Sequence, residues 1–137
     1  MNVYVAGKFS QRTLILKKME ELETMGLQIT FKWPIYIDMS LVEAAEKEIQ
    51  GVQACDLLIV LMLDKTHDYR GTFTEIGCAL ALNKAIFIIN DLEEYERFEE
   101  KEELKGYYES NCFYHHPRLF HCKSWTHCLN LITLRIP

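Results

Sequence analysis

The chain has 137 residues and a formal net charge of −5. This length allows one domain, residues 1–137, whose core needs neither disulfides nor a metal. The acidic balance argues against a nucleic-acid polymer as partner, because phosphate backbones are bound by clustered Lys and Arg, but it does not exclude free nucleotides.

No apolar run approaches the roughly 20 residues that cross a bilayer, and Met1 leads into a strand pattern rather than a signal peptide. The five cysteines are an odd number without a CxxC pair, and Cys55 and Cys78 lie within apolar strand and helix patterns. We therefore expect a cytoplasmic protein with reduced cysteines and no membrane partner.

The first element is an apolar stretch at residues 2–6 that predicts a strand, followed after Gly7 by helical periodicity over residues 10–25. A strand, a glycine turn and a helix N-terminus together present backbone N–H groups and a helix dipole to an anion such as phosphate. Three polar side chains could add contacts there: Lys8, Ser10 and Arg12. Because Gly7 stands alone, without GxGxxG or GxxxxGKS, a plain tight turn is the alternative interpretation.

Gly26 ends this helix, and the alternation over residues 27–33 predicts a second strand that Pro34 stops. Trp33 and Tyr36 lie at and beyond its end, where aromatic rings either stack on a ligand base or pack at the rim of the core.

Ser40, with Glu43 three residues on, has the pattern of a capping box and predicts a helix to about residue 53. The apolar positions of this helix form one face: Val42, Ala45, Ile49 and Val52. Glu48 lies beside that face in the C-terminal half, where the helix dipole does not favour an acid. It is either a solvated surface acid or a functional one.

Residues 54–90 form the central unit. The near-continuous apolar run at 57–63 predicts a strand buried on both faces, and Thr72 is the expected N-cap of a helix that leads to another strand at 85–89. Such crossovers lie in one parallel sheet, and ligands bind beyond the carboxyl ends of its strands. Glu75 is expected in the first helical turn, where the dipole favours its ionised form, but Thr72 and Glu75 also fit a purely structural capping box.

In the last third, residues 91–110 are rich in Glu and Lys and predict a solvated helix or flap without chemistry. A strand at 119–122 and a helix opened by Ser124 follow. Cys and His residues at 112–128 raise the question of zinc, but their spacings fit no common finger, and we expect no metal. The assembled fold is a doubly wound α/β domain, flavodoxin-like or Rossmann-like, with five parallel strands in the order 2-1-3-4-5.

Three segments of the chain resemble the nucleoside 2-deoxyribosyltransferase-like superfamily, which includes 2'-deoxynucleoside 5'-phosphate N-glycosidases. These are VYVAG at 3–7, EIQGVQACDLLIV at 48–60 and RGTFTEIGCALALNKAIFI at 70–88. The third is the most specific, a Gly-x-x-x-Glu-x-Gly-x-Ala helix start after a central strand. The resemblance covers most of residues 2–90 and does not extend to the last third of the chain.

The resemblance implies an N-glycosidase or deoxyribosyltransferase that needs no cofactor and forms a homodimer or larger homo-oligomer. Glu75 then corresponds to the nucleophile that forms a glycosyl-enzyme ester, Tyr4 to the tyrosine bonded to it, and Glu48 to an acid that protonates the leaving base. This division of roles suits a reaction in which the sugar gains oxocarbenium character. The expected substrate contacts are Gly7, Lys8, Ser10, Arg12, Asp68, Tyr69, Gly71 and Thr72.

Three positions depart from the family pattern. Glu48 is one methylene longer than the usual Asp, and the first turn, GKFSQR, lacks the Gly-Ser-x-Arg-Gly-Gly of the phosphate-specific enzymes. Tyr69 stands where transferases often carry Asp, a role that the neighbouring Asp68 could take. Two alternative functions therefore stay open: a nucleotide-binding or sensing module without catalysis, and an NAD glycohydrolase.

Overall fold

The computed structural model describes residues 1–92 and 105–135. Its parallel sheet has five strands in the order β2-β1-β3-β4-β5, which confirms the predicted fold class and strand order. The strands are β1 (Asn2–Gly7), β2 (Gln28–Ile29), β3 (Leu57–Leu61), β4 (Ala85–Ile89) and β5 (Leu119–Cys122). The α-helices are α1 (Arg12–Thr24), α2 (Leu41–Ala54), α3 (Arg70–Ala81) and α4 (Trp125–Thr133), and short 3-10 helices lie at Phe9–Gln11, Trp33–Ile35, Tyr107–Ser110 and Cys112–His115.

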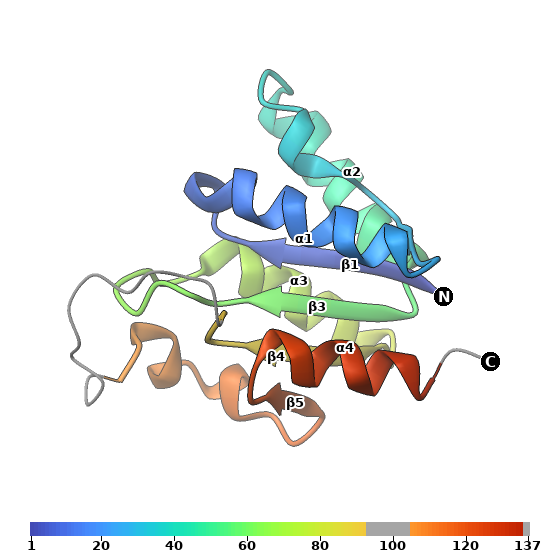
Figure 1. The fold of residues 1–137 in the computed structure, drawn as a ribbon. Helices are drawn as coiled ribbons and strands as arrows, with labels where there is room; N and C mark the ends of the chain where they lie inside the picture. Colours follow the sequence, from blue (N-terminus) through green and yellow to red (C-terminus); the bar gives the residue numbers. More distant parts are fainter. Residues whose placement is uncertain (93–104, 136–137) are drawn as a thin grey trace.

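Helices cover both faces of the sheet: α1 and α4 lie on one face, and α3 lies on the other (Figure 1). Helix α2 packs against α3 and β1. Because side chains alternate along a strand, successive residues of β1 face helices on opposite sides of the sheet. A Cβ at Gly7 would lie 2.5 Å from Ile15 of α1, whereas the Tyr4 ring lies under Gly51 of α2.

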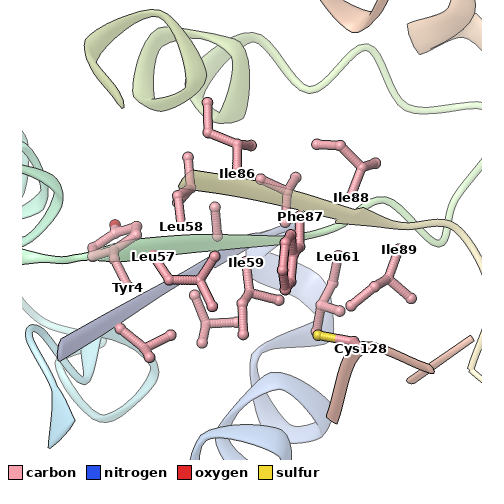
Figure 2. Packing of buried hydrophobic residues seen from close by; sticks show 14 of the residues in the cluster. Tyr4, Leu57, Leu58, Ile59, Leu61, Ile86, Phe87, Ile88, Ile89 and Cys128 are labelled. Carbon is pink, nitrogen blue, oxygen red and sulfur yellow. The ribbon is translucent and has the colours of Figure 1, made fainter. Parts of the chain in front are cut away.

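The central strand β3 is buried along its whole length, as its continuous apolar run predicts. In Figure 2, Ile86 and Ile88 point to one face of β4, and Phe87 and Ile89 point to the opposite face, where Cys128 of α4 lies. A sheet with both faces covered fixes its strands firmly.

Two of the predicted helix N-caps are confirmed by side-chain hydrogen bonds. Ser40 Oγ accepts from Glu43 N at 3.2 Å at the start of α2, and Ser124 Oγ accepts from His127 N at 3.0 Å at the start of α4. Gly26 has a φ of 88°, the left-handed conformation expected of a glycine after a helix.

The prediction of a strand over residues 27–33 is wrong beyond its first residues, because β2 has only two residues. After β2 the chain leaves the sheet edge, because its side chains form hydrogen bonds with backbone carbonyls elsewhere in the fold. Thr30 Oγ1 donates to the Gly51 carbonyl at 2.8 Å, and Trp33 Nε1 donates to the Val5 carbonyl at 2.7 Å. Alternation alone could not reveal these long-range bonds.

The apolar face predicted for α2 is only partly buried. Val52 is fully buried, but Val42 is 72% exposed and Ala45 is also exposed, because the first half of α2 extends beyond the sheet (Figure 1). Most of the predicted 91–110 segment lies outside the described residues. Within the described ranges 1–92 and 105–135, no helix has the length and apolar character to cross a membrane.

Candidate active site

Glu75 of α3 is an acid in an apolar core. Its side chain is 8% exposed, and it lies against Tyr4 in β1, whose hydroxyl donates a hydrogen bond to the carboxylate. One carboxylate oxygen, Oε2, is buried and has no hydrogen-bond partner among the described residues. An unpaired buried oxygen of this kind costs on the order of 1–3 kcal/mol, so its presence needs an explanation.

Helix α3 begins earlier than predicted, and this removes the capping explanation for Glu75. Tyr69 is the N-cap, in a left-handed conformation with φ 57° and ψ 40°, and Arg70 is the first helical residue. Thr72 is thus inside the helix, so the predicted N-cap and capping box are wrong. Glu75 also lies past the first turn, where the helix dipole has less influence on its charge.

Burial is the main influence on the Glu75 carboxyl. It raises the pKa of Glu75, the hydrogen bond from Tyr4 lowers it, and the charge of Glu48 raises it again, to about 8. The same burial, together with the Glu75 charge, raises the pKa of Tyr4 well above its usual value. Tyr4 therefore remains a hydroxyl that can donate to the carboxylate.

Glu48, in the C-terminal half of α2, is the second acid of the site. It is half-buried, and burial raises its pKa. Two interacting acids with raised pKa values titrate as a pair and keep a proton near neutral pH. The pair can therefore supply one carboxylate and one carboxylic acid at the same time, which is what acid-assisted displacement requires.

A cavity of about 320 Å³ opens beside Glu48. Its other lining residues are apolar or aromatic: Phe9, Phe31, Trp33, Tyr36, Ile37, Met39, Leu41 and Ala44. The Phe31 and Tyr36 rings are stacked with centroids 5.5 Å apart, and the Trp33 indole N–H is already bonded to Val5. Such a lining suits a flat, aromatic group held by stacking, with Glu48 as its polar contact.

A more open hollow of about 460 Å³ is lined in part by Asp38, Glu43 and Lys47, and Glu48 is not among its lining residues. Glu75 lines neither this hollow nor the smaller cavity. The hollow shares four lining residues with the smaller cavity: Phe31, Tyr36, Ile37 and Met39. The smaller cavity, which is lined by Glu48, the acid whose charge acts on Glu75, is therefore the candidate for chemistry.

Comparison with sequence models of protein families matches residues 3–107 to nucleoside 2-deoxyribosyltransferase. The chain belongs to this family. A nucleoside 2-deoxyribosyltransferase family member is an enzyme of the N-glycosidase or transferase type. Both acids, Glu48 and Glu75, lie within the matched residues.

Among solved structures, the family member shares its fold with the CMP N-glycosidase BcmB of Clostridium botulinum. The match has a TM-score of 0.57 and 19% sequence identity, and it covers 98% of this chain and 99% of the other. No curated protein sequence matches the chain.

The turn after β1 does not present its basic side chains freely. Lys8 Nζ is 2.5 Å from Asp64 Oδ2, and the Arg12 guanidinium lies 4.7 Å from the centre of the Phe9 ring and donates to the Phe9 carbonyl at 3.4 Å. Ser10 is exposed. The two basic side chains of the predicted anion site, Lys8 and Arg12, thus already interact with neighbouring residues.

The loop before α3 holds the remaining predicted substrate contacts. Tyr69 is buried, its hydroxyl accepts from the Asp64 backbone N–H at 3.0 Å, and it does not line the cavity. Asp68 is exposed and pairs with Arg70 at 2.7 Å. Gly71 is exposed and Thr72 is buried at the start of α3.

The structure therefore brings Tyr4, Glu48 and Glu75 together, as the sequence predicts. It adds Phe9, Phe31 and Asp64, which sequence reasoning missed. Phe31 and Trp33 lie outside β2, so strand alternation could not have predicted that both rings line the cavity. Within the described ranges, no three His, Cys, Asp or Glu side chains are grouped as a metal site would require.

Proposed function

We propose that this enzyme breaks the N-glycosidic bond of a nucleoside or nucleotide through a covalent intermediate on Glu75. The observation that carries the proposal is the buried Oε2 of Glu75, which has no hydrogen-bond partner among the described residues. Glu75 interacts with a second acid, Glu48, which lines an aromatic cavity. The name of the structural neighbour, a CMP N-glycosidase, supports the same substrate class.

In the first step, a Glu75 carboxylate oxygen attacks the anomeric carbon of the sugar. The bond from this carbon to the base nitrogen breaks, its electron pair goes to the base, and the Glu48 carboxyl proton neutralises the departing base. The reactive arrangement has the proton on Glu48 and the charge on Glu75. Positive charge that develops on the sugar stabilises this arrangement.

In the second step, water or another base attacks the anomeric carbon of the glycosyl ester, and the bond from this carbon to the Glu75 oxygen breaks. Its electron pair returns to the Glu75 carboxylate, and Glu48, now ionised, accepts the proton of the attacking group. Water gives hydrolysis and a second base gives transfer. Tyr4 holds the Glu75 carboxylate in place by its hydrogen bond through both steps.

The aromatic cavity receives the base, and the carboxyl edge of the sheet receives the sugar. On the sugar side we propose the two turns that bracket this edge: Gly7, Lys8, Ser10, Arg12, Asp68, Gly71 and Thr72. Tyr69 acts indirectly, because its hydroxyl holds the backbone of Asp64.

A second candidate function is a nucleotide-binding module without catalysis. Tyr69 favours it, because the side chain at the position where transferases often carry Asp is buried in its own loop. Such a module would still bind a ligand in the aromatic cavity, but it would release no base.

Chromatographic detection of free base distinguishes these functions. The protein is incubated with ribo- and deoxyribonucleosides, their 5'-monophosphates and NAD, each with and without an acceptor base. We expect base release from the wild type and its loss, by about three orders of magnitude or more, in Glu75→Gln. Unimpaired release by Glu75→Gln would remove Glu75 from the nucleophile role, and release of nicotinamide alone would identify NAD as the substrate.

We also propose that the enzyme is a cytoplasmic homo-oligomer. All five cysteines are free, which favours a reducing compartment. Exposed apolar side chains gather around the start of α2, which favours association with a second copy.

A further inference from the structure

Gly51 is a buried glycine inside α2, where its backbone conformation does not require a glycine. Its φ is not positive, and glycine is among the least favourable residues in a helix interior. The reason for the glycine is a contact: an added Cβ would lie 2.8 Å from Cδ2 and 2.9 Å from Cε2 of Tyr4, and 3.0 Å from the Cβ of Phe31. The missing side chain thus lets α2 lie directly against the Tyr4 ring of β1.

Three parts of the candidate site meet at this glycine. Tyr4 donates a hydrogen bond to the Glu75 carboxylate, and Phe31 lines the aromatic cavity. Glu48 is three residues before Gly51 in α2, a spacing that places both residues on the same side of the helix. The contact between α2 and β1 therefore determines how far the second acid lies from the first.

A hydrogen bond fixes the same point of α2. The Gly51 carbonyl belongs to the last turn of the helix, where carbonyls lack intrahelical partners, and Thr30 Oγ1 donates to it at 2.8 Å. Thr30 directly follows β2, which pairs with β1. Helix α2 is thus held by packing at the glycine and by this bond beside it.

A methyl group added at residue 51 would displace α2 rather than Tyr4. The Tyr4 ring is 1% exposed, and its strand pairs with β2 on one side and with β3 on the other. Helix α2 has no such support along its first half, which extends beyond the sheet (Figure 1). A shift of α2 away from β1 would carry Glu48 away from Glu75.

We propose that Gly51 is a positioning residue, which holds Glu48 close enough to Glu75 for the two acids to share a proton. The inference rests on the proposed function, since it concerns the same acid pair. Gly51 has no side chain that could contact the substrate, so it acts through the position of α2.

The titration of Glu75 reports this distance. Burial raises the pKa of Glu75 and the Glu48 charge raises it further, to about 8, while the bond from Tyr4 opposes both. These are the titratable groups that face Glu75 from α2 and β1, and Cys55, just after α2, interacts with Tyr4. If α2 moves away, the charge of Glu48 acts less strongly and the carboxylate is less buried, so both changes should lower the pKa of Glu75.

Gly51→Ala tests the proposal through NMR titration of isotope-labelled glutamate carboxyl groups. The Glu75 signal is assigned by its loss in Glu75→Gln. We expect the Glu75 midpoint to fall by about one pH unit or more in Gly51→Ala. The alkaline limb of the pH profile for base release should move to lower pH with it, and the maximum kcat/KM should fall by about tenfold. A purely structural glycine would change stability alone, so an unchanged midpoint in folded Gly51→Ala would overturn the proposal.

Thr30→Val tests the same contact without adding an atom to α2. It removes the hydrogen bond to the Gly51 carbonyl and keeps the size of the side chain. The Glu75 midpoint should again fall, by about half a pH unit, because α2 is held less firmly. If Gly51→Ala does not fold, an unchanged midpoint in Thr30→Val would overturn the proposal.

The matched control is Gly77→Ala, which makes the same substitution in α3, the helix that carries Glu75. A Cβ at Gly77 meets no other part of the described chain within 4 Å. This variant should keep the wild-type Glu75 midpoint. A midpoint that fell as far in Gly77→Ala as in Gly51→Ala would contradict the assignment to the contact at Gly51.

The titration separates this inference from the proposed function, because it needs no substrate. If no base is released from any nucleoside or nucleotide, the proposed function fails, but a lowered Glu75 midpoint in Gly51→Ala would still establish the positioning role. If the wild type releases base and the midpoint is unchanged in Gly51→Ala, the positioning role fails and the proposed function stands.

Discussion

At the scale of single residues, Glu75 is poorly explained by stability alone. A buried acid that serves the fold is normally paired with a base or caps a helix, and Glu75 does neither. Among the described residues, the Tyr4 hydroxyl bonds to its carboxylate, its Oε2 has no hydrogen-bond partner, and the second acid, Glu48, raises its pKa further. The arrangement destabilises the empty protein, which is typical of functional sites.

The raised pKa of Glu75 predicts how the free energy of unfolding depends on pH. The unfolded chain releases the Glu75 proton near the usual pKa of glutamate, whereas the folded protein keeps it up to about pH 8. Between these values the folded state binds more protons, so its free energy of unfolding falls as pH rises. Glu75→Gln removes this contribution and should be more stable than wild type at pH 8, by on the order of 1–3 kcal/mol, with little difference near pH 4.

Urea unfolding at pH 4, 6 and 8 checks this prediction. The exposed acid Glu46 on α2 provides the control, because Glu46→Gln should follow the wild-type pH dependence. Parallel curves for wild type and Glu75→Gln would mean that the pKa of Glu75 is the same in the folded and the unfolded protein.

The acids of the site could be predicted from the sequence, but their surroundings could not. Glu75 and Tyr4 lie in short segments with recognisable patterns, and each pattern places its residue directly. The Lys8–Asp64 contact spans 56 positions and depends on the pairing of Gly7 with Leu61. No short sequence pattern encodes the pairing of these two strands. The contact between Lys8 and Asp64 could therefore not be predicted before the fold was known.

At the scale of elements, α3 is fixed at its end by a residue far along the chain. The Arg118 guanidinium donates to the Leu80 carbonyl at 3.0 Å, the Lys84 carbonyl at 2.9 Å and Asn83 Oδ1 at 3.3 Å. These acceptors lie at the C-terminus of α3 and in the turn to β4, where a positive charge also complements the helix dipole. Arg118 thus anchors the helix that carries Glu75 to the segment leading into β5.

Arg118→Ala should lower the free energy of unfolding by about 1–2 kcal/mol, because it leaves charge-assisted bonds unmade. Arg118→Lys should recover only part of the loss, since one ammonium cannot match the planar fork of the guanidinium. Urea unfolding measures both, with Lys123→Ala as a control for removing an exposed positive charge beside β5. Stability within about 0.3 kcal/mol of wild type in Arg118→Ala would show that these bonds contribute little.

The periodicity of apolar residues predicted where the helices and strands lie, and the wrong predictions concern where these elements begin and end. The sheet order, the four α-helices and the strands other than β2 were predicted, because each has a sustained apolar pattern. The start of α3 was not, since Tyr69 adopts a left-handed conformation that aromatic residues seldom take. The ring is held there by tertiary contacts, with His67 at 4.5 Å and Tyr108 at 5.9 Å between centroids.

At the scale of the whole molecule, exposed apolar side chains of the described residues gather around the start of α2. We call this surface the α2 patch: Ile35, Tyr36, Ile37, Leu41 and Val42, which are 52%, 49%, 58%, 90% and 72% exposed. Three of these residues also line the cavity beside Glu48. A second copy seated on the patch would therefore bury apolar surface and close the cavity from water.

Val42 is the residue at which to test this association, because it belongs to the patch but does not line the cavity. Light scattering during size-exclusion chromatography should give at least a dimer for wild type. Val42→Glu should weaken the association by about tenfold or more, since it places an unpaired charge in an apolar interface. Leu134→Glu, at an 84% exposed position after α4, should leave the assembly intact.

Because the partner would also shield the cavity, Val42→Glu should lower kcat/KM for base release, and high protein concentration should restore it. A wild-type monomer at all concentrations, or full activity in a monomeric Val42→Glu, would show that one chain completes the site alone.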